Sequence, residues 1–495
     1  DWRTHMQFNS IQYLVFLLIA VIVYFAVPSK LRQPWLLAAS YFFYMNWNAK
    51  YALLLFFSTF STWVFALLIA KHQPHRKVFL TLCIIINLAL LFYFKYFNFL
   101  VGSAMHLLRR SFDPWDIVLP VGISFYTLQA LGYSIDVYRG DTEAETNFIR
   151  YALFVSFFPQ LVAGPIERSG NMLHQIREVP MQSRRDLIRA ENIRSGLILL
   201  FWGLFLKVVI ADRISIFVDE VFSRYTTCGT LVLLLAAVGF LLQLYCDFSS
   251  YSIIATGSAR IMGFHLMENF HAPLLSHSVS EYWRRWHISL STWLRDYIYI
   301  PLGGNRKGTA RKVLNTMITF LVSGFWHGAS WTYVCWGIIH GILVSAESLL
   351  RKPFRSLTVK TCTRTGSFGF RLLQTLGTFV LLTFSYIFFR SVSIADAFAY
   401  IRLIFTQPDF WILNNGGLFE YGLNVQEVFI LLFAVLLLLA VDMLLVRKNM
   451  SLDVWLSSQW VVFRVLFVLF IVMYTVVYGI YGPGFSSKQF IYFQF

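Results

Sequence analysis

Apolar runs that are long enough to cross a membrane recur along the whole chain. A membrane-spanning helix needs about 20 mostly apolar residues, in a range of roughly 17–25. We predict spans over Ile11–Val27, Tyr51–Ala70, Val78–Val101, Ile117–Ile135, Ile193–Ile210, Thr230–Ala255, Val313–Val344, Leu373–Phe389, Val428–Val446 and Val461–Tyr481. Two shorter runs, Pro34–Trp47 and Tyr151–Ala163, predict tilted, partial or re-entrant helices. The sequence therefore predicts an all-α polytopic membrane protein with about 10–13 transmembrane helices.

Composition excludes two other classes of protein. Charged residues make up 13% of the chain and the mean hydropathy is +0.61, whereas soluble domains carry about 25% charged residues. The net charge of +16 does not indicate nucleic-acid binding, because the basic residues occur in short runs between apolar segments, as the positive-inside rule requires. The five cysteines are scattered and have the spacing of neither a disulfide framework nor a zinc site.

The polar loops indicate an orientation. Four basic stretches are predicted to be cytoplasmic, and they are Lys71–Lys77, Arg184–Arg194, Asn305–Lys312 and Arg351–Arg371. The stretch Gln407–Gln426 contains two acidic residues and no lysine or arginine, which predicts the opposite side. We interpret residues 1–495 as one integral unit. Met6 is the expected natural start, which makes residues 1–5 a remnant ahead of it.

One segment is too polar for a span and too aromatic for an ordinary loop. It begins with "HLMENFHAPLLSHSVSEYWRRWHISLSTWLR" at His265–Arg295 and continues to residue 308. Irregular polar backbone at membrane depth is tolerated only where protein or a water-filled cavity surrounds it. We therefore predict that residues 265–308 form short amphipathic or re-entrant helices that line a cavity.

The region 313–346 contains two histidines in the run "SGFWHGASWTYVCWGIIHG". Ionisable groups within membranes are costly and by default functional, but a histidine that bonds to a neighbouring carbonyl in a packed helix is an equal alternative. The pairs Gly324/Gly328 and Gly337/Gly341 have the spacing that lets helices approach closely. His340 follows His327 by 13 residues and would point the opposite way on one helix, which predicts a structural role for it.

Two further groups are candidate site residues. His287 is flanked by Trp283, Arg284, Arg285 and Trp286, and arginines beside indoles either hold phosphates or anchor an interfacial helix. Tyr245 and Asp247 stand late in an apolar run. A carboxylate at the centre of a membrane helix costs about 2.5–3.5 kcal/mol. Asp247 is therefore expected to have a partner or to line a wet cavity, and structural pairing with an arginine and direct catalysis are equal alternatives.

Histidine is the main acid–base group that the sequence offers near neutral pH. The chain contains no G-x-S-x-G or H-E-x-x-H motif and no set of Cys and His with the spacing of metal ligands. The sequence therefore predicts neither a serine-hydrolase nucleophile elbow nor a zinc site. "GGNRKGT" at Gly303–Thr309 is similar to a phosphate loop, but it lacks the lysine before the threonine.

The run "WHGASW" at Trp326–Trp331 resembles the signature of the membrane-bound O-acyltransferase (MBOAT) family. Four other stretches resemble its bacterial branch, the membrane subunits of alginate-type polysaccharide O-acetyltransferases: "EYWRRWHISLSTWLRDYIYIPLGGNRKG" (Glu281–Gly308), "LPVGISFYTLQALGYSIDVYRG" (Leu119–Gly140), "FFPQLVAGPIER" (Phe157–Arg168) and "FIYFQF" (Phe490–Phe495). The chain departs from the family pattern at Ser250 and Ile253, where Gly and a second Asp are usual, and at Thr332, where Asn is common.

The resemblance implies a helical shell around a central tunnel in the bacterial cytoplasmic (inner) membrane. Acetyl-CoA would be the cytoplasmic donor substrate, with no permanently bound cofactor, no metal and no nucleic-acid partner. The acceptor would be an extracytoplasmic polysaccharide, reached directly or through a hydrolase-like partner protein, and membrane lipid would surround the chain. His327 and His287 carry over as catalytic residues. We assign donor-binding or tunnel-lining roles to Trp283, Arg284, Arg285, Trp286, Tyr245, Asp247, Trp326 and Trp331.

Three alternatives remain at this stage. The first is the related D-alanyl transfer subunit for teichoic acid, which resembles this chain in its two histidines and takes its acyl group from a carrier protein. The second is a transporter or channel in which the histidines form a proton path. The third is a scaffold without enzymatic activity, which would tolerate the loss of His327.

Overall fold

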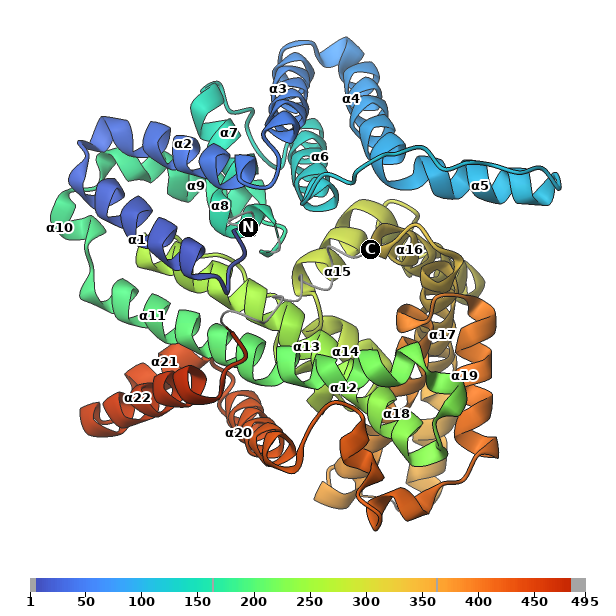
Figure 1. Cartoon of the computed structure of the whole chain (residues 1–495). Helices are drawn as coiled ribbons and strands as arrows, with labels where there is room; N and C mark the ends of the chain where they lie inside the picture. Colours follow the sequence, from blue (N-terminus) through green and yellow to red (C-terminus); the bar gives the residue numbers. More distant parts are fainter. Residues whose placement is uncertain (1–5, 163, 362–363, 482–495) are drawn as a thin grey trace. The chain divides into compact units, whose positions relative to one another are not determined.

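Helices dominate the computed structural model, which describes residues 6–162, 164–361 and 364–481, and no strand occurs in these ranges (Figure 1). This confirms the all-α prediction. The helices group into two compact units. The first comprises the chain up to Gly203 together with Tyr251–Met267, and the second comprises Leu204–Ser250 and the chain from Glu268 onward. The predictions for residues 1–5 and for Phe490–Phe495 lie outside the described residues.

The first unit is built around α3, which packs against α4, α6 and α7. Its helices are α1 (Ile11–Ala26), α2 (Arg32–Met45), α3 (Ala49–Lys71), α4 (Arg76–Leu91), α5 (Phe97–Leu107), α6 (Ile123–Arg139), α7 (Phe148–Ser156), α8 (Phe158–Leu161), α9 (Ser169–Glu178), α10 (Arg184–Leu187), most of α11 (Ala190–Phe205) and the end of α13 (Thr230–Ile261). A π-helical turn, Phe92–Tyr96, joins α4 to α5, and short 3₁₀ turns occupy Ser29–Leu31, Gln73–His75 and Val179–Met181.

The second unit contains His287, His327 and His340. Its helices are α12 (Asp212–Ser223), α14 (Val279–Arg285), α15 (Ile288–Leu294), α16 (Gly308–His327), α17 (Trp331–Lys360), α18 (Phe368–Arg390), α19 (Ile394–Thr406), α20 (Val425–Lys448), α21 (Leu452–Ser457) and α22 (Val461–Tyr478), with most of α13. π-Helical turns occupy Leu206–Ala211 and Arg295–Tyr299, and 3₁₀ turns occupy Tyr225–Thr227, Pro273–Leu275, Phe410–Leu413 and Gly417–Glu420.

Eight helical stretches within the described residues are long and apolar enough to cross a membrane: Ala49–Lys71, Gln73–Leu107, Arg184–Ser223, Thr230–Ile261, Trp331–Lys360, Phe368–Arg390, Val425–Lys448 and Val461–Tyr478. The protein is therefore a multi-pass membrane protein. The apolar helix α1 is shorter, with 16 residues. The predicted span over Ile117–Ile135 becomes helical only at Ile123, because Gly122 has a φ of 75°, which a right-handed helix does not accommodate.

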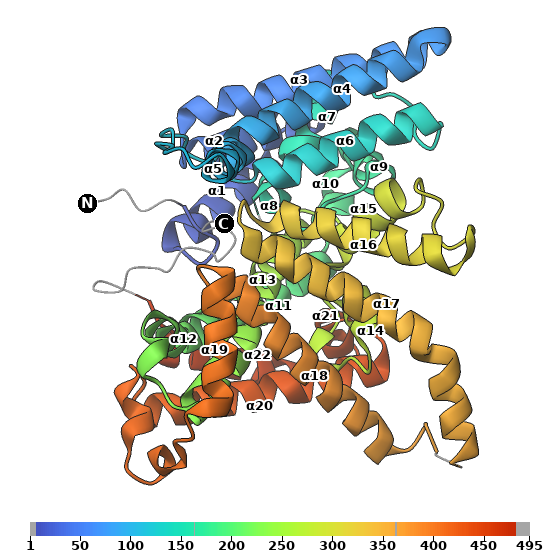
Figure 2. The ribbon, with the colours of Figure 1, turned by 90° about the vertical axis from the view of Figure 1, so that its right-hand side faces the viewer.

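The prediction of one helix over Val313–Val344 is wrong. Helix α16 ends at His327, the chain turns at residues 328–330, and α17 starts at Trp331. The two helices then run side by side as an antiparallel hairpin (Figure 2). A Cβ on Gly328 would lie 2.2 Å from the Tyr333 ring, so only glycine fits at the turn.

Small residues allow the α16–α17 hairpin to close. A Cβ on Gly324 would lie 2.4 Å from the Tyr333 carbonyl oxygen, and a Cβ on Gly337 would lie 2.4 Å from the Phe320 carbonyl oxygen. Real Cβ atoms do not approach backbone oxygens so closely. The close helix approach predicted from the G-x-x-x-G spacing is thus confirmed, although the two partners are α16 and α17, the two halves of the predicted Val313–Val344 helix.

The substitution Gly324→Ala tests this packing. We expect it to lower the free energy of unfolding by about 1–3 kcal/mol, the usual cost of overpacking, because the added methyl group meets backbone rather than a movable side chain. Gly377→Ala in α18 is the matched control, since nothing lies within 4 Å of its added carbon and it gains the same helix propensity. Thermal unfolding in detergent measures both variants. Equal thermal midpoints for Gly324→Ala and Gly377→Ala would contradict the close approach of α16 and α17.

Candidate active site

His327 is the last residue of α16 and is held by the turn that precedes it. Its Nδ1 lies 2.6 Å from the Ser323 carbonyl oxygen, and the residue is 2% exposed. A carbonyl oxygen can only accept a hydrogen bond, so Nδ1 carries the proton and donates it. In the neutral imidazole the second nitrogen, Nε2, therefore carries a lone pair, which is the form that a general base requires.

Aromatic rings enclose His327. The centroids of Trp326, Trp336 and Phe389 lie 5.0, 4.9 and 5.6 Å from the centroid of the imidazole ring. Trp336 is fully buried on α17 and Phe389 is buried near the end of α18. Such an apolar surrounding strengthens any electrostatic interaction within the site, because little water is available to screen it.

His287 stands where α14 gives way to α15, with a φ of 43°. This left-handed backbone is uncommon for a non-glycine residue and persists only where its surroundings hold it. Asn269 supplies that support. Its carbonyl oxygen accepts from the Ile288 N–H at 2.9 Å, and its side-chain Oδ1 accepts from the Ser289 N–H at 3.2 Å and from the Ser289 hydroxyl at 2.9 Å.

The same contacts fix the tautomer of His287. Its Nδ1 lies 3.2 Å from the Asn269 side-chain atom that the Ser289 N–H contacts. A backbone N–H can only donate, so this Asn269 atom is the oxygen and His287 Nδ1 is the donor. Its Nε2 therefore also carries a lone pair in the neutral ring. The sequence reasoning missed Asn269, because an asparagine in a polar loop gives no signal of the histidine that it will orient.

Trp326 connects the two histidines. Its ring centroid lies 5.6 Å from that of His287 and 5.0 Å from that of His327. His287 is fully buried and also packs edge-on against Phe248, at 4.7 Å. Burial, and secondly the nearby His327, hold the pKa of His287 well below its usual value. Two predicted catalytic residues and one predicted tunnel-lining residue thus form a single cluster.

His340 has a different environment. The Trp283 indole N–H donates to His340 Nδ1 at 3.1 Å, and His340 Nε2 lies 3.1 Å from the Ser385 hydroxyl. Both ring nitrogens are therefore used by neighbouring side chains, as in a packing residue. The rotational argument that separated His340 from His327 was wrong, since it assumed one continuous helix. Trp336 lies between them instead, with its ring 4.7 Å from His340 and 4.9 Å from His327.

Asp247 belongs to a buried ionic cluster. Its Oδ1 lies 2.5 Å from Lys207 Nζ, which also lies 2.8 Å from Asp212 Oδ1. The expected arginine partner is therefore a lysine, on the π-helical turn between α11 and α12. Asp247 is followed by Phe248, whose ring packs on His287, so the ion pair anchors the part of α13 that covers the histidine.

The remaining predicted residues divide into buried and exposed groups. The Tyr245 hydroxyl donates to Asp442 at 2.9 Å, and the buried Trp286 lies 6.5 Å from the Tyr245 ring. Arg285 is ion-paired with Glu281 at 2.6 Å. Arg284 and Trp331 are exposed, unlike the two buried histidines.

Lys207, Asp212 and Asp442 are buried charged residues that sequence reasoning missed. Each stands in an apolar stretch of the sequence, and the cost of a membrane charge that drew attention to Asp247 applied equally to them. Among the described residues, no three His, Cys, Asp or Glu side chains gather as metal ligands.

The Asn269→Asp variant tests the orientation of His287, which lies outside the eight membrane-spanning stretches. A carboxylate still accepts from Nδ1, but its negative charge raises the pKa of the imidazole. In the wild type the lowered pKa keeps His287 neutral through neutral pH. In the variant we expect activity to fall as the pH drops through the raised pKa. The measurement is the pH profile of kcat/KM. Asn269→Gln is the uncharged comparison. If the pH profiles of the wild type and Asn269→Asp coincide, the hydrogen bond between residue 269 and His287 Nδ1 is contradicted.

Comparison with known proteins relates this chain to one family of membrane enzymes. Residues 144–389 match the family described as MBOAT, membrane-bound O-acyltransferase family. A probable alginate O-acetylase, AlgI, of Pseudomonas aeruginosa is 37% identical over 410 residues, which cover 81% of this chain and 75% of the relative. A peptidoglycan O-acetyltransferase of Helicobacter pylori is 33% identical over 418 residues, covering 78% of this chain and 77% of the relative. A teichoic acid D-alanyltransferase of Streptococcus thermophilus is 32% identical over 248 residues, covering 47% and 58%.

These similarities define the class of protein. The chain belongs to the membrane-bound O-acyltransferase family, and it is an O-acyltransferase. The matched segment contains both His287 and His327 as well as Asn269 and the Lys207 cluster.

Proposed function

We propose that this protein takes an acetyl group from cytoplasmic acetyl-CoA and delivers it to a hydroxyl of an extracytoplasmic polysaccharide, directly or through a partner protein. The observation that carries the proposal is the pair of buried imidazoles on either side of Trp326, each with Nδ1 donating and Nε2 free of a proton. Relatives that match over about three quarters of their own length are named for O-acetylation of alginate and peptidoglycan, and they support the choice of acyl group and acceptor.

The chemistry follows from the tautomers. The acceptor hydroxyl oxygen attacks the thioester carbonyl carbon while His327 Nε2 removes the hydroxyl proton. The C–S bond then breaks, the imidazolium returns the proton to the departing thiolate, and the ester remains on the acceptor. General base catalysis of this kind contributes typically about 10²–10⁴-fold. His287 Nε2 has no proton to offer a carbonyl, and the one proton of the attacking hydroxyl goes to His327, so the role of His287 is to accept a hydrogen bond from another donor group of the substrate and position it.

The proposed donor site uses the exposed basic groups of the second unit. Arg285 is neutralised by Glu281, whereas Arg284 is exposed, as are most of the basic residues of Asn305–Lys312. Positive groups at the mouth of a site raise the local concentration of an anionic donor such as CoA. We assign this basic stretch to the cytoplasmic side because positively charged loops favour that side, and the relatives, which are bacterial, support the bacterial inner membrane as the location.

Transfer of labelled acetyl from acetyl-CoA tests the proposal directly. Inside-out vesicles that contain the protein are supplied with the donor, and label is followed into the polysaccharide and protein fractions. We expect label in one of these fractions for the wild type and none above background for His327→Ala at matched expression. Label in the protein fraction would identify a relay through a partner.

A D-alanyl transferase is the second candidate, on the basis of the teichoic acid D-alanyltransferase similarity. That relative is matched over 58% of its length, against 75% and 77% for the O-acetylating relatives. The same vesicles supplied with a D-alanyl-loaded carrier protein separate the two candidates. Transfer from the carrier and none from acetyl-CoA would overturn the acetyl assignment.

A further inference from the structure

A cavity of about 560 Å³ lies between the C-terminal end of α17 and the beginning of α18, away from the histidine cluster. Its lining includes Arg351, Phe354, Arg355, Val359, Phe370 and Gln374. Cavities of roughly 300–1,000 Å³ are the size that holds small molecules. We call this cavity the α17–α18 pocket.

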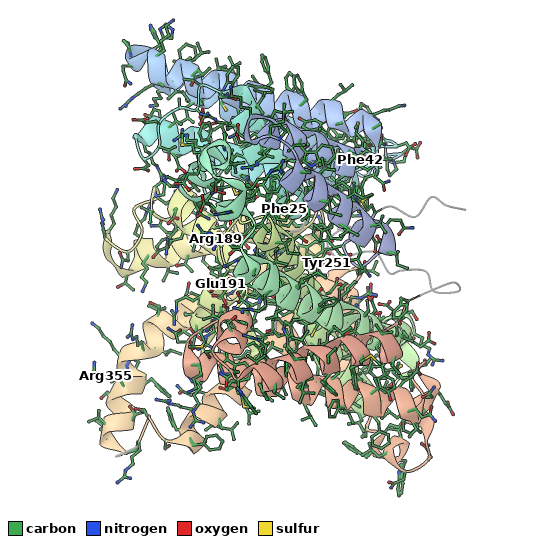
Figure 3. All side chains as sticks on the ribbon, turned by 90° about the vertical axis from the view of Figure 1, so that its left-hand side faces the viewer. Phe25, Phe42, Arg189, Glu191, Tyr251 and Arg355 are labelled. Atoms are coloured by element: carbon green, nitrogen blue, oxygen red, sulfur yellow. The ribbon has the colours of Figure 1, made fainter. Side chains whose placement is uncertain are left out.

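The α17–α18 pocket is positively charged. Arg351 and Arg355 stand one helical turn apart on α17 and both are exposed. Arg355 is labelled in Figure 3. No carboxylate pairs with either arginine within the described residues. The stretch Arg351–Arg371 contains six lysines and arginines and no acidic residue. The pocket thus presents two guanidinium groups, which suit the oxygens of a phosphate ester.

The other wall of the α17–α18 pocket is apolar. The rings of Phe354 and Phe370 lie with their centroids 6.3 Å apart across the two helices, and Val359 also lines the pocket. Pro353 lies inside α17, where a proline removes a backbone hydrogen bond and bends the helix. Figure 2 shows α17 bending toward its C-terminal end. The bend carries the arginines and the apolar wall to the beginning of α18.

Both helices that form the pocket belong to membrane-spanning stretches. A pocket at their ends therefore lies near the membrane surface, where arginines can meet headgroups and apolar side chains can meet acyl chains. Basic pockets between transmembrane helices on the cytoplasmic side suit anionic headgroups, and the positive-inside rule places Arg351–Arg371 on that side.

We propose that the α17–α18 pocket binds the headgroup of an anionic glycerophospholipid, with Arg351 and Arg355 on the phosphate and Phe354, Val359 and Phe370 against the start of the acyl chains. This inference does not depend on the proposed function. It concerns a site whose lining residues belong to α17 and α18, together with Thr365.

Binding is tested with the purified full chain after removal of its native lipids. The probe is a photoactivatable phosphatidylglycerol in phosphatidylcholine nanodiscs, and the labelled peptides are mapped by mass spectrometry. We expect label on the peptides that cover residues 351–361 and 364–374. The double variant Arg351→Gln/Arg355→Gln should weaken labelling about 30-fold, as expected for the loss of two direct charge-assisted contacts with the headgroup phosphate.

The matched control is Lys360→Gln/Arg364→Gln. Both residues are exposed and lie in the same basic stretch, but neither lines the pocket. The control removes the same net charge, and we expect its labelling to stay within about threefold of the wild type. An equal loss in the two double variants would overturn the proposal, because it would show diffuse attraction of the basic stretch to the membrane.

A second experiment distinguishes a lipid ligand of the α17–α18 pocket from a soluble phosphate ester. We expect that neither sn-glycerol 3-phosphate nor free CoA, each at millimolar concentration, displaces the labelled lipid. Displacement by either would show a phosphate or donor site rather than a lipid site. Label mapped mainly to peptides outside residues 351–374 would overturn the proposal without any variant.

Discussion

Replacement of His327 by alanine is expected to lower kcat for acyl transfer by about 10²–10⁴-fold, which is the usual contribution of a positioned general base. The structure gives the physical reason. The Ser323 carbonyl holds the Nδ1 proton, so Nε2 is the atom that can take a proton from the acceptor. The measurement is single-turnover transfer of labelled acyl group, at donor concentrations that saturate the wild type.

His340→Gln is the control for this experiment. His340 is buried in the same aromatic cluster and packs on the other side of Trp336, and glutamine can keep one acceptor and one donor for Trp283 and Ser385. We expect the His340→Gln rate to stay within about tenfold of the wild type. A His327→Ala variant that unfolds no earlier and still transfers at the wild-type rate would show that His327 is a packing residue.

Lys207→Met is expected to have the largest effect on stability. It leaves the carboxylates of Asp247 and Asp212 buried without their cation. Removing one partner of a buried ion pair typically costs about 3–5 kcal/mol, because the remaining charge has lost both water and its partner. We expect little folded protein in detergent, measured as the monodisperse fraction in size-exclusion chromatography together with the thermal midpoint.

The neutral triple variant Lys207→Met/Asp212→Asn/Asp247→Asn separates charge from shape. It removes the cation and both carboxylates while keeping nearly the same side-chain volumes. Replacing a whole buried ionic group by neutral residues is often close to neutral in stability, so most of the folded fraction should return. A triple variant as unstable as Lys207→Met would mean that the lysine acts through its packing.

The sequence was sufficient to predict the fold class and most of the long helices. Apolar length determines where a helix can span a membrane, and α3, α13, α18, α20 and α22 lie close to the predicted ranges. Hairpins and short helices were harder to predict from the sequence, because a turn made of small residues leaves no signal in the hydropathy. The turn after His327 has an apolar, aromatic sequence on both sides, so only the fit of Tyr333 against Gly328 shows where α16 ends.

The two histidines of the candidate site could be predicted from the sequence, but the groups that orient their rings could not. The MBOAT resemblance supplied His327 and His287, and the cost of a buried charge supplied Asp247. Asn269 and Ser323 could not be found from residue type, since the first acts through one amide oxygen and the second through its main chain. Lys207 could have been found by counting every charge inside an apolar run, as was done for Asp247.

The position of His327 at the very end of α16 has a consequence for its counter-charge. Many catalytic histidines rely on a carboxylate to orient the ring and to balance the imidazolium. Here the orienting group is the Ser323 main-chain oxygen, and the negative end of the helix dipole favours a cation on the last turn by about 0.3–1 kcal/mol. Both the orienting oxygen and the helix dipole belong to the backbone. The hydroxyl group of Ser323 is therefore not needed to hold the base, although the residue is buried, whereas the length of α16 is needed.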